Sequence, residues 1–432
     1  MSDLIFALAS AKGRAGVSII RLSGTDAIKT TEIFAGSNLP LHGRSLRKLR
    51  DVDGAFIDQA LIITFAKGAS FTGEEVVEIQ CHGSVAVVAA LLRILGEHPK
   101  CRLAEPGEFT RRALESGELD LAQVEGLADL IEAETESQRR LAARAMDGAL
   151  SAKVAKWRTD LIRAVSLIEA TIDFADEDIP VDVTPEVLEL INQTQADLRA
   201  EITGSFAAER IIEGFEVAIV GPPNAGKSTL LNALAGRDAA ITSEIAGTTR
   251  DVIEVRMDIG GLAVTLLDTA GLRETDDTVE KIGVERARTR AASADLRVFL
   301  TTDGSVADTK LQPSGDDIVV IGKSDLGTTG DALLVSGKSG AGLDALVAQV
   351  SAILVNRSQG AQTATRERHR IAMVQAQVYL DAGKELMAQG SEVSELASAE
   401  FHQGVAVLSS LIGAVGVEDL LDEIFASFCL GK

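Results

Sequence analysis

The stretch Gly221-Pro-Pro-Asn-Ala-Gly-Lys-Ser228 decides the fold around it, because it matches the pattern G-x-x-x-x-G-K-[ST]. The apolar run Val217–Val220 precedes it and a predicted helix, Thr229–Ala235, follows it, which is the context that the pattern requires. In such a loop the backbone N–H groups and the helix N-terminus face phosphates. Lys227 would add positive charge, and Ser228 would offer its hydroxyl to Mg²⁺. The stretch therefore predicts a nucleotide-binding α/β domain.

A second motif, Asp268-Thr-Ala-Gly271, follows an apolar strand-like run, as the other magnesium-side motif of such a domain should. We expect Asp268 to hold Mg²⁺ through its water shell and the Gly271 N–H to sense the terminal phosphate. Gly247-Thr-Thr-Arg-Asp251 lies between the two motifs. Of its two threonines, we predict that Thr249 completes the magnesium shell.

The stretch Gly322-Lys-Ser-Asp325 resembles the guanine-reading sequence Asn-Lys-x-Asp, with Gly322 in place of the asparagine. Asp325 keeps the carboxylate that accepts from the guanine N1 and N2 groups, which adenine cannot match, and Lys323 can cover the base. Ser336-Gly337-Lys338 fits the remaining base-side loop. We therefore expect selectivity for GTP to be retained with weaker binding, and equal hydrolysis of ATP and GTP would contradict this.

Leu272 stands where Ras-like switches carry a glutamine that orients the attacking water. Another group must therefore assist hydrolysis, and the candidates are the acidic side chains that follow the second motif. The residues alone do not choose among these acids, which are Glu274, Asp276, Asp277, Glu280 and Glu285.

The texture of the sequence differs on the two sides of this α/β block. Residues 1 to about 116 mix turns with short strand-like runs, the best of which are Val17–Leu22, Ala60–Phe65 and Val76–Gln80. Apolar residues recur at helical spacing from Leu119 to Phe174, and a helix-forming composition continues from Thr184 to Ile212 and again from Thr365 to Phe428. One helical domain therefore brackets an inserted α/β domain, with two separate helical domains as the alternative.

We predict a multidomain α+β and α/β protein. Residues 1–117 form an N-terminal α/β domain, residues 118–212 and 358–432 a discontinuous all-α domain, and residues 213–357 an inserted Ras-like P-loop G domain. Glu254–Ile259 alternates apolar and charged residues, which predicts an edge strand of the G domain. The basic cluster Arg44, Arg47, Lys48 and Arg50 is predicted to be a solvated loop.

The composition limits the class of protein. The net charge of −22 argues against binding nucleic acid by non-specific electrostatics alone, although a local basic patch is compatible with it. Three cysteines, Cys81, Cys101 and Cys429, form no metal-binding spacing and indicate a reduced, cytoplasmic protein. We expect no signal peptide and no membrane span, and a terminal Lys432 suits prenylation of Cys429 poorly.

The chain resembles the MnmE family, also called TrmE, of tRNA-modification GTPases over essentially its whole length. Both ends and the middle carry family-like motifs in the right order, which makes the resemblance specific. These motifs are Ser18–Gly24, Phe71–Glu75, His82-Gly83, Ala104–Thr110, Leu119–Gln123, Gly221–Ser228, Asp268–Thr275, Ile282–Ala287 and the C-terminal Phe428-Cys-Leu-Gly-Lys432.

This resemblance implies that residues 1–117 are a folate-binding and dimerisation domain. It implies GTP hydrolysis coupled to modification of the wobble uridine of certain tRNAs, by a homodimer in a heterotetramer-type complex with the FAD protein MnmG. A one-carbon unit from 5-formyl-tetrahydrofolate or a related folate becomes the methylene of an aminomethyl-type group, such as carboxymethylaminomethyl, at uridine C5. Glycine or ammonia supplies the nitrogen.

The resemblance also implies how hydrolysis is assisted. K⁺-dependent pairing of two G domains places the ion where an arginine finger would put its charge. Asn224 is then the main K⁺ ligand, the loop Ser243–Thr248 closes over the ion, and Glu280 orients the attacking water. Lys227 and Cys429 complete the expected catalytic set, Cys429 because it matches a family cysteine that matters for the modification.

The predicted GTP-binding residues are Asn224, Ala225, Gly226, Lys227, Ser228, Thr229, Ser243, Glu244, Ile245, Ala246, Gly247, Thr248, Thr249, Asp268, Thr269, Ala270, Gly271, Lys323, Asp325, Ser336, Gly337 and Lys338. The predicted metal ligands are Ser228 and Thr249 for Mg²⁺, and Asn224, Ser243, Ile245 and Thr248 for K⁺.

For the folate, the resemblance points to Arg21, Glu78, Glu118 and the terminal Lys432. Cationic Arg21 and Lys432 suit glutamyl carboxylates, and an acidic side chain suits the pterin edge. The family position that usually holds a lysine is Glu118 here, so its charge is reversed.

Two other functions remain open at this point. A ribosome-assembly GTPase would act as a binding switch, but such proteins usually add a basic RNA-binding module, and the C-terminal part here is not strongly basic. A folate-dependent aminomethyl transferase with a regulatory G domain differs mainly in which protein performs the transfer.

Overall fold

The computed structural model of the chain describes residues 3–173, 182–237, 254–268, 289–306, 311–413 and 431. The chain divides into two compact units, Met1–Ala128 with Ser409–Lys432, and Asp129–Leu408. Helix α4 (Leu121–Glu132) spans the division between them. None of the described helices is long and apolar enough to cross a membrane.

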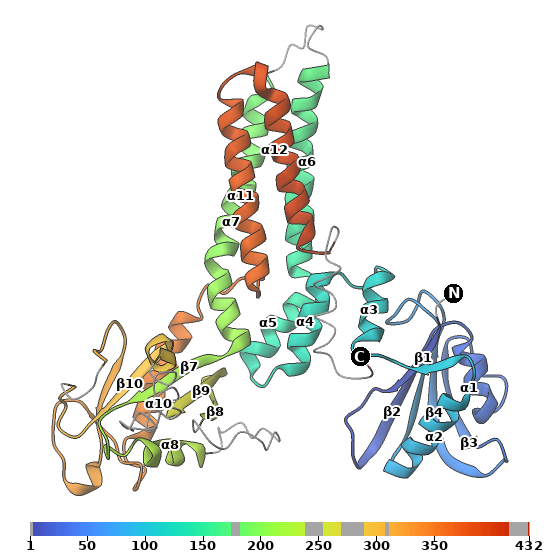
Figure 1. The fold of residues 1–432 in the computed structure, drawn as a ribbon, viewed down its shortest axis with the longest axis horizontal. Coiled ribbons are helices and arrows are strands. Elements are labelled where there is room, and N and C mark those ends of the chain that lie inside the picture. The colour runs from blue at the N-terminus through green and yellow to red at the C-terminus, as the bar shows by residue number, and fades with distance from the viewer. Residues whose placement is uncertain are drawn as a thin grey trace, which may run out of the picture. The chain divides into compact units, whose positions relative to one another are not determined.

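The first unit contains a six-stranded sheet with the strand order β3-β4-β5-β2-β1-β6 (Figure 1). All neighbouring strands are antiparallel except β1 and β6, which are parallel. The strands are β1 (Leu4–Leu8), β2 (Ala15–Ser23), β3 (Gly43–Arg50), β4 (Phe56–Phe65), β5 (Val76–Gly83) and β6 (Cys101–Leu103), and the helices are α1 (Ala27–Ala35), α2 (Val85–Glu97) and α3 (Glu108–Glu115).

Helices α1 and α2 cover one face of this sheet because alternate strand residues are apolar. Ile20 on β2, Ile62 on β4 and Ile79 on β5 are fully buried in the core that Leu91 and Leu95 of α2 complete. The three strands predicted in this region are confirmed by β2, β4 and β5.

The prediction of a loop at Arg44–Arg50 is wrong, because these residues form the edge strand β3. The buried side chain of Leu49 anchors the strand, and every residue of β3 is paired with β4, with one register shift between Leu49 and Arg50. Period-two apolar patterning is weak in this stretch, so its charges hid the strand.

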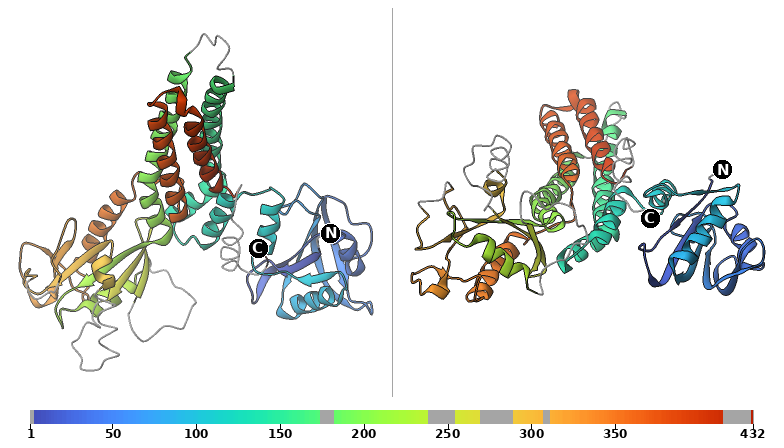
Figure 2. Two further views of the ribbon diagram at one scale, coloured as in Figure 1. Left: turned by 45° about the horizontal axis from the view of Figure 1, so that its top comes forward. Right: turned by 60° about the horizontal axis from the view of Figure 1, so that its bottom comes forward.

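The helices of the second unit form a long bundle, in which α6, α7, α11 and α12 run side by side (Figures 1 and 2). The helical stretches predicted in this region are confirmed as far as the structure describes them, since Phe174 and residues 414–428 lie outside the described residues. Pro185 lies in the first turn of α7 as expected. The helices are α5 (Glu136–Met146), α6 (Ala149–Asp173), α7 (Thr184–Glu213), α11 (Glu367–Met387) and α12 (Ser394–Ser410), with the short 3₁₀ helix η2 (Ser391–Val393) before α12.

The sheet of the second unit has the strand order β12-β11-β10-β7-β9-β8, parallel except for β8, which pairs antiparallel at the edge. This confirms the prediction of an edge strand at Glu254–Ile259. Helices α8 and α10 cover one face of the sheet. The elements are β7 (Phe215–Val220), α8 (Lys227–Ala235), β8 (Glu254–Ile259), β9 (Leu262–Asp268), β10 (Leu296–Thr301), β11 (Ile318–Ile321), η1 (Ser324–Leu326), β12 (Leu333–Leu334) and α10 (Leu343–Arg357).

The chain re-enters the helical bundle through a buried clamp on α7. The Glu201 carboxylate, 1% exposed, accepts hydrogen bonds from the Thr363 N–H and hydroxyl, at 3.2 and 3.0 Å, and pairs with Lys153. A Cβ on Gly204 would stand 2.4 Å from the Gly360 carbonyl oxygen, so the returning segment crosses α7 where the helix has no side chain.

We expect Glu201→Ala to destabilise this unit by about 1–3 kcal/mol, because buried donors lose their acceptor. Urea denaturation of the full chain measures the change in the free energy of unfolding. Glu189→Ala, on an exposed position of the same helix, is the matched control and should change it little. Equal stabilities of the two variants would contradict the role of the clamp.

Candidate nucleotide-binding site

The predicted phosphate loop connects β7 to α8 at the carboxyl edge of the parallel sheet, which is where ligands of such sheets bind. Gly221 leaves β7 so close to β10 that a Cβ would stand 2.2 Å from the Leu300 carbonyl oxygen, so only glycine fits. Asn224 and Gly226 have positive φ angles of 63° and 101°. Turns of this kind gather backbone N–H groups into an anion-binding concavity.

Three polar side chains converge on this loop. The Lys227 side chain folds back over it, and Nζ donates to the carbonyl oxygens of Gly221 and Pro222, at 2.8 and 3.0 Å. Ser228 Oγ donates to Asp268 Oδ2 at 2.7 Å, and Asp268 is 6% exposed. The two oxygens assigned to Mg²⁺ therefore meet at one point, and hard oxygen ligands of this kind suit that ion.

The base-side residues are held by a network around one serine. Ser336 Oγ donates to Asp325 Oδ1 at 2.7 Å and accepts from the N–H groups of Lys338 and Ser339, at 3.2 and 3.1 Å. Lys323, just before η1, has a positive φ of 57°. The network fixes the direction of the Asp325 carboxylate, the group predicted to distinguish guanine from adenine.

Two glycines let the base-side loops pack against the phosphate loop. A Cβ on Gly337 would stand 2.7 Å from the Thr229 carbonyl carbon and oxygen. A Cβ on Gly322 would stand 2.9 Å from Leu300 Cδ1 and 3.2 Å from the Ala225 carbonyl oxygen. The Leu300 side chain therefore fills part of the space that an asparagine at Gly322 would need.

We expect Gly322→Asn alone to weaken nucleotide binding, because the new side chain must displace Leu300. Combined with Leu300→Ala, the asparagine can reach the Ala225 carbonyl, and a hydrogen bond worth about 1 kcal/mol would tighten binding about fivefold relative to Leu300→Ala alone. Titration with a fluorescent GDP checks this. A double variant that binds no better than Leu300→Ala would show that Leu300 does not stand in for the amide.

Several predicted site residues lie outside the described residues. In the G domain these are Ser243–Thr249, Thr269–Gly271 and Glu280, and at the C-terminus they are Cys429 and Lys432.

Two of the four residues predicted to bind folate, Arg21 and Glu78, lie on the first sheet, and the structure brings them together. Arg21 and Glu78 are cross-strand neighbours on β2 and β5, and Arg21 Nε and Nη2 donate to Glu78 Oε1 at 3.0 and 2.8 Å. The guanidinium carbon of Arg21 lies 5.7 Å from the ring centres of Phe71 and Phe109. The pair presents a cation and a carboxylate beside apolar rings, which can suit a flat, partly charged ligand.

The other two residues predicted to bind folate are Lys432, which is not described itself but follows Gly431, and Glu118. Gly431, the residue before the terminal lysine, packs so closely on β1 that a Cβ would stand 2.3 Å from the Leu8 carbonyl oxygen. Leu8 adjoins Ala7, which is paired with Arg21. Glu118 Oε1 lies 3.2 Å from where a Cβ of Gly73 would be, and the described contacts do not connect it with Arg21 or Glu78.

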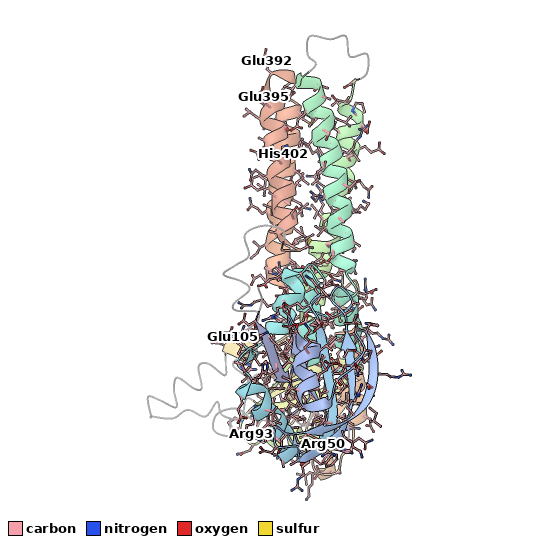
Figure 3. All side chains as sticks on the ribbon, turned by 90° about the vertical axis from the view of Figure 1, so that its right-hand side faces the viewer. Arg50, Arg93, Glu105, Glu392, Glu395 and His402 are labelled. Atoms are coloured by element: carbon pink, nitrogen blue, oxygen red, sulfur yellow. The ribbon has the colours of Figure 1, made fainter. Side chains whose placement is uncertain are left out.

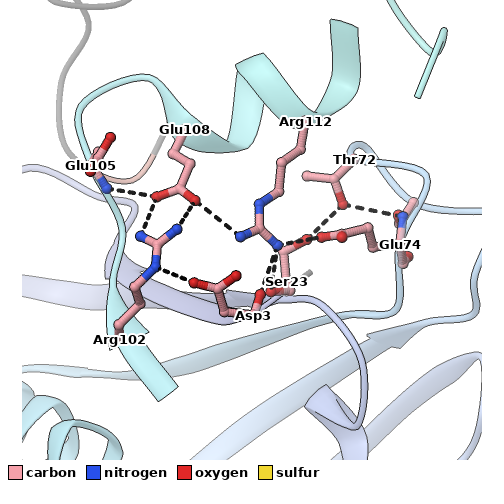
Figure 4. A network of polar contacts seen from close by, with 9 residues as sticks. Asp3, Ser23, Thr72, Glu74, Arg102, Glu105, Glu108 and Arg112 are labelled. Atoms are coloured by element: carbon pink, nitrogen blue, oxygen red, sulfur yellow. Dashed lines mark hydrogen bonds and ion pairs between the residues drawn. The ribbon is translucent and has the colours of Figure 1, made fainter. Parts of the chain in front are cut away.

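The structure also contains a buried network of ion pairs beside this sheet, which the sequence analysis did not predict (Figure 4). Arg112, 8% exposed, donates to Glu74 Oε2 at 2.9 Å and to Glu108 Oε1 at 3.0 Å. Burial alone would raise the pKa of Glu108, but hydrogen bonds from Arg102, the Glu105 N–H and Arg112 outweigh it and hold that pKa below its usual value. The signal was available, since Glu74 and Glu108 fall in family-like motifs.

The motif His82-Gly83 also has a structural explanation. The buried Asp58 carboxylate accepts from the His82 N–H at 2.8 Å and lies 2.7 Å from His82 Nδ1. Burial acts to raise the pKa of Asp58, but the hydrogen bonds from His82 and the Gln59 N–H leave it lowered. A Cβ on Gly83 would stand 2.4 Å from the Ala15 carbonyl oxygen, so glycine is required there.

Two family models match the chain: the GTP-binding protein TrmE N-terminus at residues 4–118, and the MnmE helical domain at residues 121–429. The chain is similar over the full length of both sequences to the tRNA modification GTPases MnmE of Ruegeria pomeroyi and Cereibacter sphaeroides, each 57% identical with 100% of both chains covered. That of Paracoccus denitrificans is 47% identical over the same share.

Among solved structures, the chain is similar to a variant of Era from Aquifex aeolicus bound to GDP and AlF4⁻, with 30% identity, 32% of this chain and 56% of that chain covered, and a TM-score of 0.26. It is also similar to the G domain of the FeoB iron transporter of T. maritima, with 21% identity, 34% and 99% coverage, and a TM-score of 0.24. Both scores are low, so the topology described above defines the fold.

The fold and the site together define a P-loop protein of the guanine-nucleotide-binding class, set between the two parts of a helical bundle. With both family models matched and close relatives covered from end to end, the chain belongs to the MnmE family of tRNA modification GTPases. It is accordingly a GTP hydrolase.

Proposed function

We propose that this protein couples K⁺-stimulated GTP hydrolysis to modification of the wobble uridine of certain tRNAs in the cytoplasm. It acts as a homodimer in a complex with the FAD protein MnmG and installs an aminomethyl-type group, such as carboxymethylaminomethyl, at uridine C5. The observation that carries the proposal is the match over 100% of both chains to proteins named tRNA modification GTPase.

The nucleotide side of the proposal is supported by the convergence of Ser228, Asp268 and Lys227 on the phosphate loop. Magnesium, held by Ser228 and Thr249 and through its water shell by Asp268, would neutralise charge on the phosphates when bound. Asn224 Cα lies in the left-handed turn of the loop, with Ser243, Ile245 and Thr248 as the further ligands proposed for K⁺.

The folate side is supported by the paired Arg21 and Glu78 beside two phenylalanine rings, with Gly431 packed against the neighbouring strand. We propose that this place binds 5-formyl-tetrahydrofolate or a related folate, with Lys432 completing it and Glu118 at its margin. Folate would supply the one-carbon unit, and Cys429 would serve the modification.

Mass spectrometry of tRNA nucleosides from cells that lack the gene tests the proposal. We expect the wobble uridines to lose the C5 group, wild-type protein to restore it, and Asp268→Ala, which removes a proposed magnesium-side carboxylate, not to restore it. Normal tRNA together with a defect in ribosomal subunits would instead support a ribosome-assembly GTPase.

We expect Glu280→Ala to leave nucleotide binding intact and to lower GTP turnover about 10²-fold or more, because the attacking water loses the group that orients it. Turnover and fluorescent-nucleotide affinity are measured side by side. Asp277→Ala, which removes another acid from the same segment, is the matched control. Unchanged turnover in Glu280→Ala would make the assignment wrong.

Replacing K⁺ by Na⁺ should lower turnover in the wild-type protein and not in Asn224→Gly. Glycine is the suitable replacement because Asn224 has a φ of 63°, which alanine would adopt only with strain. The ratio of the rates in the two salts is the measurement. A variant that keeps the full K⁺ stimulation would exclude Asn224 as the main ligand.

A further inference from the structure

The edge strand β3 is strongly basic in a strongly acidic chain. Residues 33–50 contain four basic residues and no acidic one, whereas the whole chain has a net charge of −22. All four, Arg44, Arg47, Lys48 and Arg50, lie in β3, at the edge of the six-stranded sheet. Charge of this sign and density favours an anionic partner.

These cations have no carboxylate partner among the residues that the structure describes. Arg47 Nη2 donates to the Asn38 carbonyl oxygen and Arg50 Nη1 to that of Gly54, both at 2.8 Å. Such bonds hold the guanidinium groups in place and leave their charge uncompensated. Nearby, Asp51 uses Oδ1 to accept the N–H groups of its own turn, at Asp53 and Ala55.

Two other exposed cations of the same unit are paired, whereas Lys12, Arg14 and Lys67 are exposed and have no carboxylate partner among the described residues. Arg93 on α2 pairs with Glu97 at 3.0 Å, and Lys29 on α1 pairs with Asp26 at 3.2 Å. Unpaired cations therefore occur elsewhere in this unit as well, and β3 is distinguished by holding four basic residues in one strand. Figure 3 labels Arg50 and Arg93, one from each group.

Large apolar side chains are exposed beside these cations. Leu46 is 63% exposed, Val52 77% and Phe56 58%. Phe56 begins β4 and is paired with Arg50, at the point where the register of the two strands shifts. The other strongly exposed phenylalanine of the described chain, Phe206, is covered by the Arg370 guanidinium, 4.4 Å from its ring centre, whereas the Phe56 ring contacts no cation or other ring of the described residues.

The alternation of β3 places three of these side chains on one face of the sheet. Leu49 is buried against the helices, so Arg44, Leu46 and Lys48, which are all exposed, lie on the opposite face of the sheet. Arg44 and Lys48 are about 13 Å apart along the strand, at roughly 3.3 Å per residue. Two cations thus flank an exposed apolar side chain on an open strand.

We propose that β3 and the beginning of β4 form an RNA-binding surface that contacts tRNA. Arg44 and Lys48 bind backbone phosphates, and Phe56 stacks on an unpaired base. Phosphate contacts supply affinity that does not depend on sequence, and exposed aromatic rings accept the splayed bases of single-stranded loops. The inference rests on the proposed function, in which tRNA is the substrate.

Protection of a sheet edge is the simplest other reason for charge on β3, since edge cations prevent pairing with another chain. That reason accounts for the cations but not for the exposed Phe56, Leu46 and Val52 beside them. An acidic protein surface would also attract the cations, and the experiment below separates it from RNA.

The test uses the full chain and measures binding of fluorescently labelled tRNA by anisotropy at several salt concentrations. We expect Arg44→Glu/Lys48→Glu to lower the affinity at least tenfold at low salt, and to reduce the slope of log affinity against log salt by about 1–2, one lost phosphate contact per cation. Phe56→Ala should lower the affinity about fivefold or more with an unchanged slope, because it removes stacking and no charge.

Lys29→Glu/Arg93→Glu is the matched control, since it changes the net charge equally on the helices that cover the other face of the sheet. It should bind tRNA within about twofold of the wild-type chain. GTP turnover without tRNA verifies that each variant is folded, because none of these residues belongs to the nucleotide site.

Three results would overturn the proposal: no binding of tRNA by the wild-type chain, equal loss in the control, or a change of molecular mass by light scattering in the β3 variants, which would make the surface a protein interface. Complementation in cells separates this proposal from the proposed function. If the wild-type gene restores the modified nucleosides, and the β3 variants bind tRNA and restore these nucleosides as well as the wild type does, only the RNA-binding surface is excluded. If the wild-type gene restores nothing, both proposals fail.

Discussion

The hydrogen bond between Ser228 Oγ and Asp268 Oδ2, 2.7 Å long, joins two segments that are 40 residues apart. It requires the ends of β7 and β9 to lie side by side in register, which the parallel pairing of Ile219 with Asp268 provides. It also requires α8 to begin immediately after the loop, with Gly226 at its N-terminus. This one short hydrogen bond therefore forms only if the strand order, the loop and the start of the helix are all in place.

Close packing extends this constraint to the base-side loops. Gly221, Gly322 and Gly337 each stand where a side chain would collide with backbone or with Leu300. These three contacts draw the ends of β7, β10 and β11 and the start of α8 together, so the phosphate and base sides form one rigid edge. Leu300 fills part of the space beside Gly322, where the sequence Asn-Lys-x-Asp would place an asparagine amide. This apolar contact connects the base-side loop to the core of the sheet.

The sequence predicted most of this edge because its motifs are local. A phosphate loop and a base-reading loop need few residues at fixed spacing, and each follows an apolar strand that is easy to recognise. It could not predict the Arg112 network, whose members Glu74, Arg102 and Glu108 meet only through the folded sheet. The strand at Arg44–Arg50 failed for the opposite reason: its exposed charges hide a period of two that only Leu49 and the pairing with β4 reveal.

The nucleotide-binding sheet is inserted in the chain between α7 and α11, and this connection has a mechanical consequence. The hairpin of β8 and β9 ends at Asp268 on one side, and at its turn the Gly261 carbonyl accepts the Ser137 N–H, at the start of α5, at 3.2 Å. Leu141 of α5 lies in the same core as the strands around the phosphate loop. Strands are stiff along their axis, and packed cores resist small displacements. A shift of Asp268 along β9 would therefore displace the first turn of α5. The Asp268 end of the site and the helical bundle are thus connected through the β8–β9 hairpin.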